Sequence, residues 1–222
     1  MSALLLVLAA LQGPPPPALD EGTFVVRRDT IEIAREDFRL FAGRPAGGWS
    51  LAATTRYNLS RPSVVLAPIL ELAADSTPLA LQYDVGDPRD PVRILGQAGR
   101  NRFTLRYMAR ASERARELAA APNTVVLDDS VFVLYLFAAW RARPSPGTLT
   151  AILPRGARRE VLTIQDLGVQ PTTLNRDPTM LRHVAVSGGA AGPAHLWLDP
   201  EGRLMKVDLP MRHLVAERRP SN

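Results

Sequence analysis

One apolar stretch, Val125–Trp140, constrains the fold of this chain more than any other feature. Its sequence is VVLDDSVFVLYLFAAW, and the part from Val131 to Trp140 carries no charge. The pattern predicts a short strand, a helix start at Asp128-Asp129-Ser130 and then a helix that is apolar on every side. Such a helix must be surrounded by other elements. Because alternating, strand-like segments precede and follow it, we expect a curved antiparallel sheet around it.

Two of the flanking segments show irregularities that locate them in the sheet. The pattern of Thr30–Leu40 slips by one residue, which indicates a bulge near Ala34–Glu36. The strand Val64–Ala73 contains Pro68, which cannot donate to a ladder, so this strand is expected at an edge or interrupted there. Other strands are expected at Gly22–Arg28, Trp49–Tyr57, Leu79–Val85, Val92–Ala98, Phe103–Ala109, Gly147–Leu153, Arg159–Leu167, Leu181–Ser187, Ala194–Asp199 and Arg203–Leu209.

Two segments are harder to assign from the sequence. Ala111–Ala121 has helical propensity but no apolar stripe, so we favour a returning strand at Arg114–Leu118. Val169–Asp177 contains turn signals and is expected to be an irregular connection. The fold class that follows is mainly β, with about ten to twelve strands. They form a curved antiparallel sheet or unclosed β-barrel with one central apolar helix as plug or lid.

Composition narrows the class of protein and of partner. The 222 residues are 46% hydrophobic, which is enough for one β-rich domain with a full core. The absence of cysteine excludes disulfides, thiolate metal sites and a lipid anchor on cysteine. The net charge is +5, but the basic residues are spread along the chain and Lys206 is the only lysine. Nucleic-acid binding needs a clustered basic face, so we do not expect it.

The N-terminal residues have the pattern of an export signal. Ala3–Leu11 is too short to cross a bilayer comfortably and resembles the apolar region of a secretory signal, with cleavage after Gln12. A short apolar helix is the alternative. We expect a signal peptide at 1–12, a proline-rich spacer at 13–20, one β-rich domain at 21–217 and a tail at 218–222. The expected location is the periplasm or the outside of the cell.

Few residues suggest chemistry, and no catalytic signature is found. His183 and His195 are expected on the outward face of the terminal strands, with His183 opposite Trp197 and Asp208 on the same face. They are weak candidates for a metal site, because such a site needs three or four converging ligands. Asp129 and Ser130 are interpreted as the helix cap. Arg102, Arg106 and Arg110 form an outward strand face, paired with acidic residues of a neighbouring strand or contacting anionic lipid headgroups. No cofactor is expected.

The order of the segments resembles that of secreted bacterial β-proteins with the architecture of the lipoprotein-localisation carriers (LolA and LolB). The resemblance rests on FVVRRDTIEIAREDFRL before GWSLAATTRYN, on TVVLDDSVFVLYLFAAW and on HLWLDPEGRLMKVDLP, and it covers roughly Gly22–Glu217. It implies an unclosed antiparallel barrel, lidded by helices, that binds acyl chains in its hollow. Val131–Trp140 would then be the lid. This chain departs from the pattern by lacking a lipobox cysteine and by offering a single lid helix.

Three functions are therefore considered. The first is a non-catalytic exported protein that binds a lipid, an acyl chain or a lipoprotein in the concavity of the sheet. Its ligand would contact Trp49, Phe132, Leu136, Phe137 and Trp140. The second is a structural or interaction module of the cell envelope with a filled core, in which a sheet edge such as the strand of Pro68 recruits a protein partner. The third is a hydrolase or metal enzyme that uses His183, His195 or Asp208. A hollow of several hundred cubic ångströms would support the first. The oligomeric state is left open.

Overall fold

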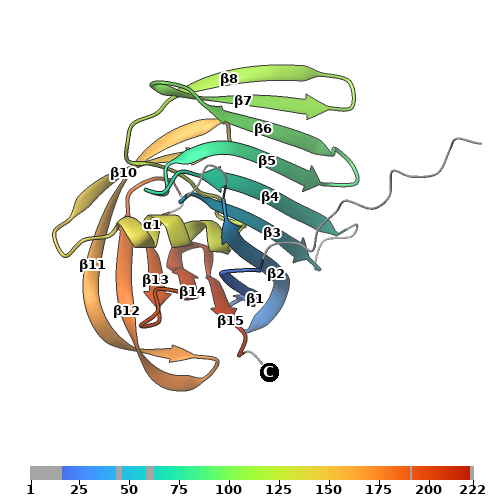
Figure 1. The fold of residues 1–222 in the computed structure, drawn as a ribbon. Coiled ribbons are helices and arrows are strands. Elements are labelled where there is room, and N and C mark those ends of the chain that lie inside the picture. Colours follow the sequence, from blue (N-terminus) through green and yellow to red (C-terminus); the bar gives the residue numbers. More distant parts are fainter. Residues whose placement is uncertain (1–16, 44–46, 59–62, 191, 221–222) are drawn as a thin grey trace, which may run out of the picture.

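The chain folds into one curved sheet that holds a single helix in its concavity (Figure 1). The computed structural model describes residues 17–43, 47–58, 63–190 and 192–220. The expected signal peptide at 1–12 and residues 13–16 of the expected spacer lie outside these ranges. Within the described residues the sheet has fifteen strands, is mostly antiparallel and does not close. The predicted mainly β, curved and unclosed architecture is confirmed.

The strands follow one another in the sheet almost as they do in the chain. From one edge to the other their order is β8-β7-β6-β5-β4-β3-β2-β1-β15-β14-β13-β12-β11-β10-β9. Their bounds are β1 (Asp20–Arg28), β2 (Ile31–Ala42), β3 (Trp49–Tyr57), β4 (Val64–Leu72), β5 (Pro78–Gly86), β6 (Val92–Ala98), β7 (Arg102–Ala109), β8 (Glu113–Ala119), β9 (Thr124–Val126), β10 (Gly147–Leu153), β11 (Arg158–Leu174), β12 (Asp177–Ser187), β13 (Ala194–Leu198), β14 (Leu204–Leu209) and β15 (Leu214–Arg218).

The central helix is a crossover between two parallel strands. A 3-10 turn at Phe132–Leu134 leads directly into α1 (Tyr135–Arg141). β9 precedes the helix, β10 follows it, and the two strands pair in parallel. The prediction of a wholly antiparallel sheet is wrong at this one pair. Parallel neighbours need a long connection, and here that connection is the apolar helix itself.

Two irregularities lie where the sequence indicated them. In the β1–β2 pair, Val26 faces Ala34 and Arg27 faces Glu32, so Ile33 is the extra residue of a bulge. β4 is an interior strand between β3 and β5, so the edge position expected for Pro68 is wrong. The predicted interruption is present instead, because the register of β3 with β4 skips over Pro68. A buried proline is tolerated there because it has no backbone N–H to donate and it lies where the β3–β4 ladder is interrupted.

The fifteen strands exceed the predicted ten to twelve, and β15 is the one strand that no predicted segment covers. β15 continues to Arg218, one residue into the predicted tail, and pairs with both β1 and β14. The segment Val169–Asp177 is not an irregular connection, because β11 runs to Leu174 and pairs with β12 over that length. The strand at Arg114–Leu118 is confirmed as part of β8. A short helical or 3-10 turn also joins β14 to β15 at Pro210–Arg212.

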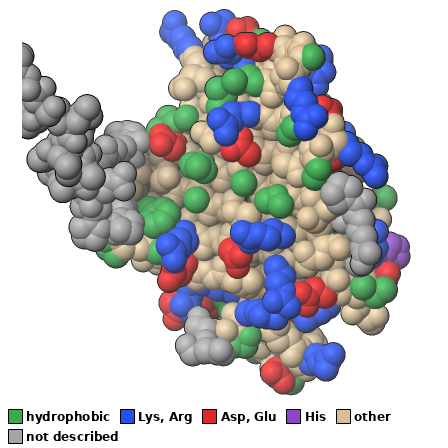
Figure 2. Space-filling model, turned by 90° about the vertical axis from the view of Figure 1, so that its right-hand side faces the viewer, with side chains coloured by type: hydrophobic (Ala, Val, Ile, Leu, Met, Phe, Trp, Pro, Cys, Tyr) green, Lys and Arg blue, Asp and Glu red, His purple; other side chains and the backbone are tan. Residues whose placement is uncertain are grey.

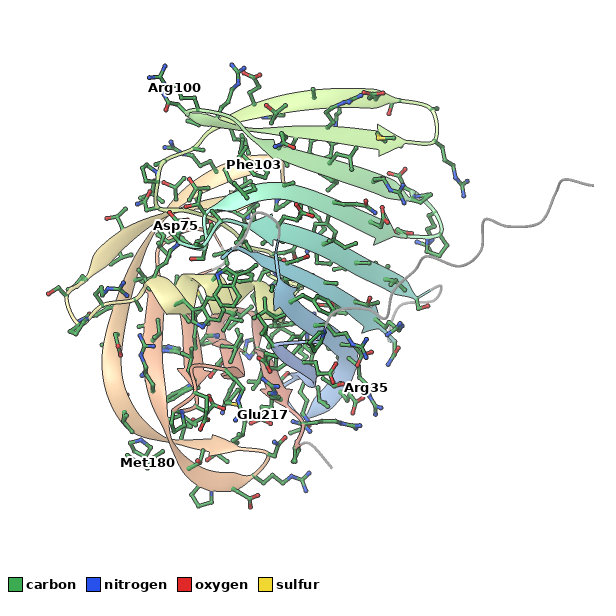
Figure 3. The ribbon with its side chains drawn as sticks, viewed as in Figure 1. Arg35, Asp75, Arg100, Phe103, Met180 and Glu217 are labelled. Atoms are coloured by element: carbon green, nitrogen blue, oxygen red, sulfur yellow. The ribbon has the colours of Figure 1, made fainter. Side chains whose placement is uncertain are left out.

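The core lies between the helix and the inner face of the sheet. Helix residues from Phe132 to Ala139 are at most 4% exposed. Phe103 on β7 points inward, whereas Arg100 in the preceding turn points outward (Figure 3). On the outer face, Arg102 pairs with Glu117 and Arg106 pairs with Glu113, as predicted for this arginine face. Acidic and basic side chains are interspersed on the face drawn in Figure 2.

Candidate functional site

The five residues predicted to contact a ligand come together, but they pack on one another. Phe132, Leu136 and Phe137 are fully buried in the core. The Trp49 and Trp140 rings lie 5.1 Å apart, and the Phe137 and Trp140 rings 5.5 Å apart. The indole of Trp140 donates to the Gly202 carbonyl over 3.0 Å. Five hollows of the described residues are lined by other side chains and by none of these five. The interior beside the helix is therefore filled.

The start of the helix is held by a carboxylate from another element. Glu36 on β2 is completely buried and accepts the backbone N–H of Phe132 over 2.8 Å and that of Val133 over 2.6 Å. The Thr55 hydroxyl also donates to it, over 2.8 Å. Burial raises the pKa of Glu36 to about 7, against the lowering effect of these hydrogen bonds. An acidic group at this point also suits the helix dipole.

The predicted cap is corrected by these bonds. The residue before the helical segment is Val131, whose side chain makes no capping bond. Asp129 instead accepts from Arg155 over 3.0 Å and pairs with Arg212. The Ser130 hydroxyl accepts from Arg155 over 2.7 Å. Asp129 and Ser130 thus fix the chain before the helix through arginines, while Glu36 on the sheet accepts the buried amides of the first turn.

An ion pair between a buried carboxylate and a partly exposed guanidinium lies next to the helix start. Asp128 is 3% exposed and accepts from two nitrogens of Arg155, each over 2.6 Å. The Tyr83 hydroxyl donates to the same carboxylate over 2.9 Å, and the Ser130 amide donates over 2.8 Å. Burial raises the pKa of Tyr83, which keeps its phenol protonated as a donor. Every polar group of Asp128 is therefore satisfied, as a buried carboxylate requires.

Beside this ion pair the surface is hollowed. The hollow, here called the Arg28–Arg155 hollow, has a volume of about 400 Å³. Its wall combines apolar side chains of β2 and β4 with guanidinium and hydroxyl groups. The lining residues are Arg28, Ile33, Tyr57, Val64, Leu66, Ser130 and Arg155. Its size falls in the range of about 300–1,000 Å³ typical of small-molecule sites. The arrangement suits a molecule with an anionic end and an apolar body.

A larger hollow is less suited to a ligand. It has a volume of about 670 Å³ and lies on the outer face of β1, β2 and β3. Several of its charged lining groups already have partners. Arg39 pairs with Glu21 over 3.0 Å, and Thr23 donates to Asp37 over 2.7 Å. A ligand would have to displace these contacts.

The two candidate histidines contact each other on the outer side of the sheet. The predicted register is confirmed, with His183 opposite Trp197 and the two rings stacked at 4.0 Å. His183 Nε2 lies 2.9 Å from His195 Nδ1, and His183 Nδ1 lies 2.8 Å from Gln170 Oε1. Burial, together with the neighbouring His195, lowers the pKa of His183. Among the residues that the structure describes, no three histidine or acidic side chains are placed to hold a metal ion.

Sequence reasoning missed Glu36, Tyr83 and Arg155 as members of this site. A usable signal exists for Glu36: beyond the bulge it shares the inward face with Phe38 and Leu40. A carboxylate in register with an apolar face needs a buried donor. Arg155 lies in a turn, where arginine is unremarkable, and nothing in the local pattern connects it with Asp128.

The comparisons with known proteins leave the resemblance to the lipoprotein-localisation carriers as a hypothesis. Family models, curated proteins and solved structures were compared, and none matched this chain. In the described part of the chain, no helix combines the length and the apolar character needed to cross a membrane.

Proposed function

We propose that this chain is a non-catalytic binding protein of the cell envelope, which holds the anionic end of an amphipathic molecule in the Arg28–Arg155 hollow. The supporting observation is the pairing of two guanidinium groups with an apolar wall in a hollow of about 400 Å³. This differs from the expectation that the ligand contacts Trp49 and the helix. In the proposed arrangement the ligand lies beside the helix start and leaves the packed helix in place.

The charges of the hollow favour a single anionic group. Arg28 is exposed, and no carboxylate of the described residues pairs with it. Arg155 directs Nε and Nη2 to Asp128, Asp129 and Ser130, and its Nη1 makes no hydrogen bond within the described part of the chain. A carboxylate or phosphate that reaches both arginines would replace water on Arg28 and on the Arg155 guanidinium, which Asp128 already holds in place. Charge-assisted bonds of this kind are about twice as strong as neutral ones.

The apolar wall would hold the body of the ligand. Ile33 and Leu66 belong to the buried inner face of the sheet, and Val64 extends it toward the surface. Each square ångström of apolar surface removed from water contributes roughly 25 cal/mol. A short stretch of acyl chain would therefore add to the charge contact without needing a cavity inside the cup.

A direct test measures binding of a fluorescent long-chain fatty acid and of its methyl ester to the full chain. The acid is expected to bind about tenfold or more tightly than the ester, since hydrogen bonds to charged groups contribute about 1.5–3 kcal/mol. Arg28→Glu should weaken binding of the acid by a similar factor. It should leave the fold intact, because Arg28 is exposed. Arg100→Glu, in the β6–β7 turn, is the matched charge control. Equal effects of both variants, or no uptake of the acid, would rule the proposal out.

A second candidate function has one observation in its favour. Among the described residues the helix is buried on all sides, and its side chains occupy the interior of the cup where a large acyl ligand would lie. This supports a filled structural module whose partners bind on the outside. Native mass spectrometry of protein extracted from an envelope separates the two proposals, because only the first expects a bound amphipathic anion.

A further inference from the structure

The sheet ends in one exposed edge strand, β8. Of the two edge strands, β9 has only three residues and all of them are buried. β8 has seven residues, and all except Leu118 are exposed. Figure 1 shows β8 at the extremity of the sheet. Among the described residues it pairs with β7 on one side and with no strand on the other, and β11 comes close to it without pairing. A row of backbone groups is therefore open along β8.

The register identifies these open groups. Ala109 N donates to Ser112 O, and Ala120 N donates to Asn101 O, at the two ends of the β7–β8 pair. Hydrogen-bonded residues alternate along an antiparallel pair. The residues of β8 that bond to β7 are therefore Arg114, Arg116 and Leu118. The open N–H and C=O groups belong to Glu113, Ala115, Glu117 and Ala119.

The side chains of β8 are sorted by charge between its two faces. On the outer face, Glu113 and Glu117 are neutralised by the arginines of β7. On the inner face, Arg114 faces Tyr107 and Arg116 faces Leu105. The Arg114 guanidinium lies 4.8 Å from the Tyr107 ring centroid. Within the described residues neither of these arginines has a carboxylate partner. The open edge thus carries two uncompensated positive charges on one face only.

The distribution of charge between the two faces of β8 determines which kind of strand can pair with it. An antiparallel strand added to the edge places each of its side chains directly opposite a β8 side chain on the same face. A second copy of β8 would put arginine opposite arginine, so antiparallel self-pairing is disfavoured. Charges on edge strands commonly prevent association. Here they favour a strand whose residues opposite Arg114 and Arg116 are acidic.

We propose that the open edge of β8 binds an extended segment of a partner protein as an added antiparallel strand, with two acidic residues spaced two apart facing Arg114 and Arg116. Backbone hydrogen bonds to the open groups provide the pairing, and the alternate acidic side chains provide the specificity. The proposal is independent of the Arg28–Arg155 hollow, which lies among β1, β2, β3, β4 and the helix start.

The probe is a fluorescent nine-residue peptide that alternates glutamate with valine or threonine, and the readout is anisotropy with the full chain. The double variant Arg114→Glu/Arg116→Glu should weaken binding about tenfold or more, because opposite-charge pairs become like-charge pairs. The same variant should bind a peptide with lysine in place of glutamate, which reverses the preference. A peptide of the same composition with its glutamates adjacent should bind poorly. Equal binding of both acidic peptides would mean attraction without strand pairing and would overturn the proposal.

A backbone test separates pairing from charge. Ala115→Pro removes an open N–H and no bond to β7, and Ala115→Val keeps the N–H as its control. Peptide binding should be lost in the proline variant and kept in the valine variant. The peptide N-methylated at the residues that bond to β8 makes the same test on the unaltered protein. Full binding of the N-methylated peptide, or displacement of the peptide by self-association at high protein concentration, would overturn the proposal. Fatty-acid binding by Arg114→Glu/Arg116→Glu should be unchanged. The experiments therefore test strand addition at β8 separately from ligand binding in the Arg28–Arg155 hollow.

Discussion

The Glu36 carboxylate on β2 accepts the backbone N–H of Phe132, 96 residues later in the chain, over 2.8 Å. This bond joins the sheet to the first turn of the helix it encloses. A helical segment this short is marginal on its own and depends on its surroundings. Its other end is tied as well, because Arg141 donates to the backbone carbonyls of Asp75 and Pro122. The helix is therefore fixed at both ends by groups of the sheet and its turns.

The first prediction concerns the pH dependence of stability. Burial raises the pKa of Glu36 from 4.5 to about 7 in the folded protein. Between these two values the folded state binds a proton that the unfolded state has released, so this group lowers stability as pH rises through the window. We expect the free energy of unfolding of Glu36→Gln to lack this loss. The difference in slope should approach about 1.4 kcal/mol per pH unit, which corresponds to one proton.

Urea unfolding of both proteins across the window measures the slopes. Glu36→Gln keeps one acceptor oxygen for the two helix amides, whereas Glu36→Ala leaves both unsatisfied. The alanine variant should therefore be destabilised at every pH, by about 1–3 kcal/mol for each buried group left without a partner. Parallel pH profiles for the wild-type protein and Glu36→Gln would contradict the assignment of the proton to Glu36.

The sequence predicts the segments whose alternation reflects burial, and it misses pairing that burial does not mark. β3 alternates because one side faces the core, with Leu51, Ala53 and Thr55 buried. The second half of β11, up to Leu174, is mostly exposed, and Val169 is 65% exposed. Its pairing with β12 therefore produces no alternation of apolar residues in the sequence. Gly168 and Pro171 there resemble turn residues, although the first belongs to a bulge and the second pairs with Met180.

The candidate site was less predictable because its contacts are long-range. A local capping signal at Asp129-Ser130 is conspicuous, but the capping group comes from a strand almost a hundred residues earlier. The apolar run predicts a wrapped helix correctly, yet it does not tell a packed helix from a removable lid. That distinction depends on how completely side chains fill the space, which no period in the sequence encodes.

The second prediction concerns the buried ion pair. Arg155→Met should destabilise the protein by about 3 kcal/mol, because it leaves the Asp128 carboxylate buried without its cation. Arg56→Met is the control: it removes an exposed pair with Asp37, whose loss should cost at most about 1 kcal/mol. Chemical denaturation measures both changes. Equal losses would indicate that Asp128 is solvated in the folded protein.

The third prediction tests close packing at a strand glycine. A Cβ added at Gly96 on β6 would lie 2.5 Å from a Phe103 ring carbon and 2.9 Å from the Leu81 Cβ. Gly96→Ala should therefore destabilise the fold by about 1–3 kcal/mol, as overpacking of a core does. Gly147→Ala, at the exposed start of β10, meets only ordinary contacts at 3.9 Å and beyond. Its unfolding midpoint should not fall. A stable Gly96→Ala would mean that β6 and β7 can separate without loss.

The fourth prediction asks whether the helix is core or lid. Phe137 is fully buried between the helix and the sheet. If the helix is core, Phe137→Ala should cost about 3–5 kcal/mol and lower the unfolding midpoint of the whole sheet. Circular dichroism of the sheet and the intrinsic fluorescence of Trp49, Trp140 and Trp197 should then change together. Met211→Ala, at a position 69% exposed, is the control and should change stability by at most about 0.5 kcal/mol.

A lid would give a different result in the same variant. The helix would loosen first, so tryptophan fluorescence and hydrogen exchange of the helix amides would change while the sheet kept its midpoint. The Glu36 bonds to Phe132 and Val133 argue against this, because moving the helix away would break both hydrogen bonds. Separate unfolding transitions of the helix and the sheet in Phe137→Ala would instead support a carrier whose helix opens.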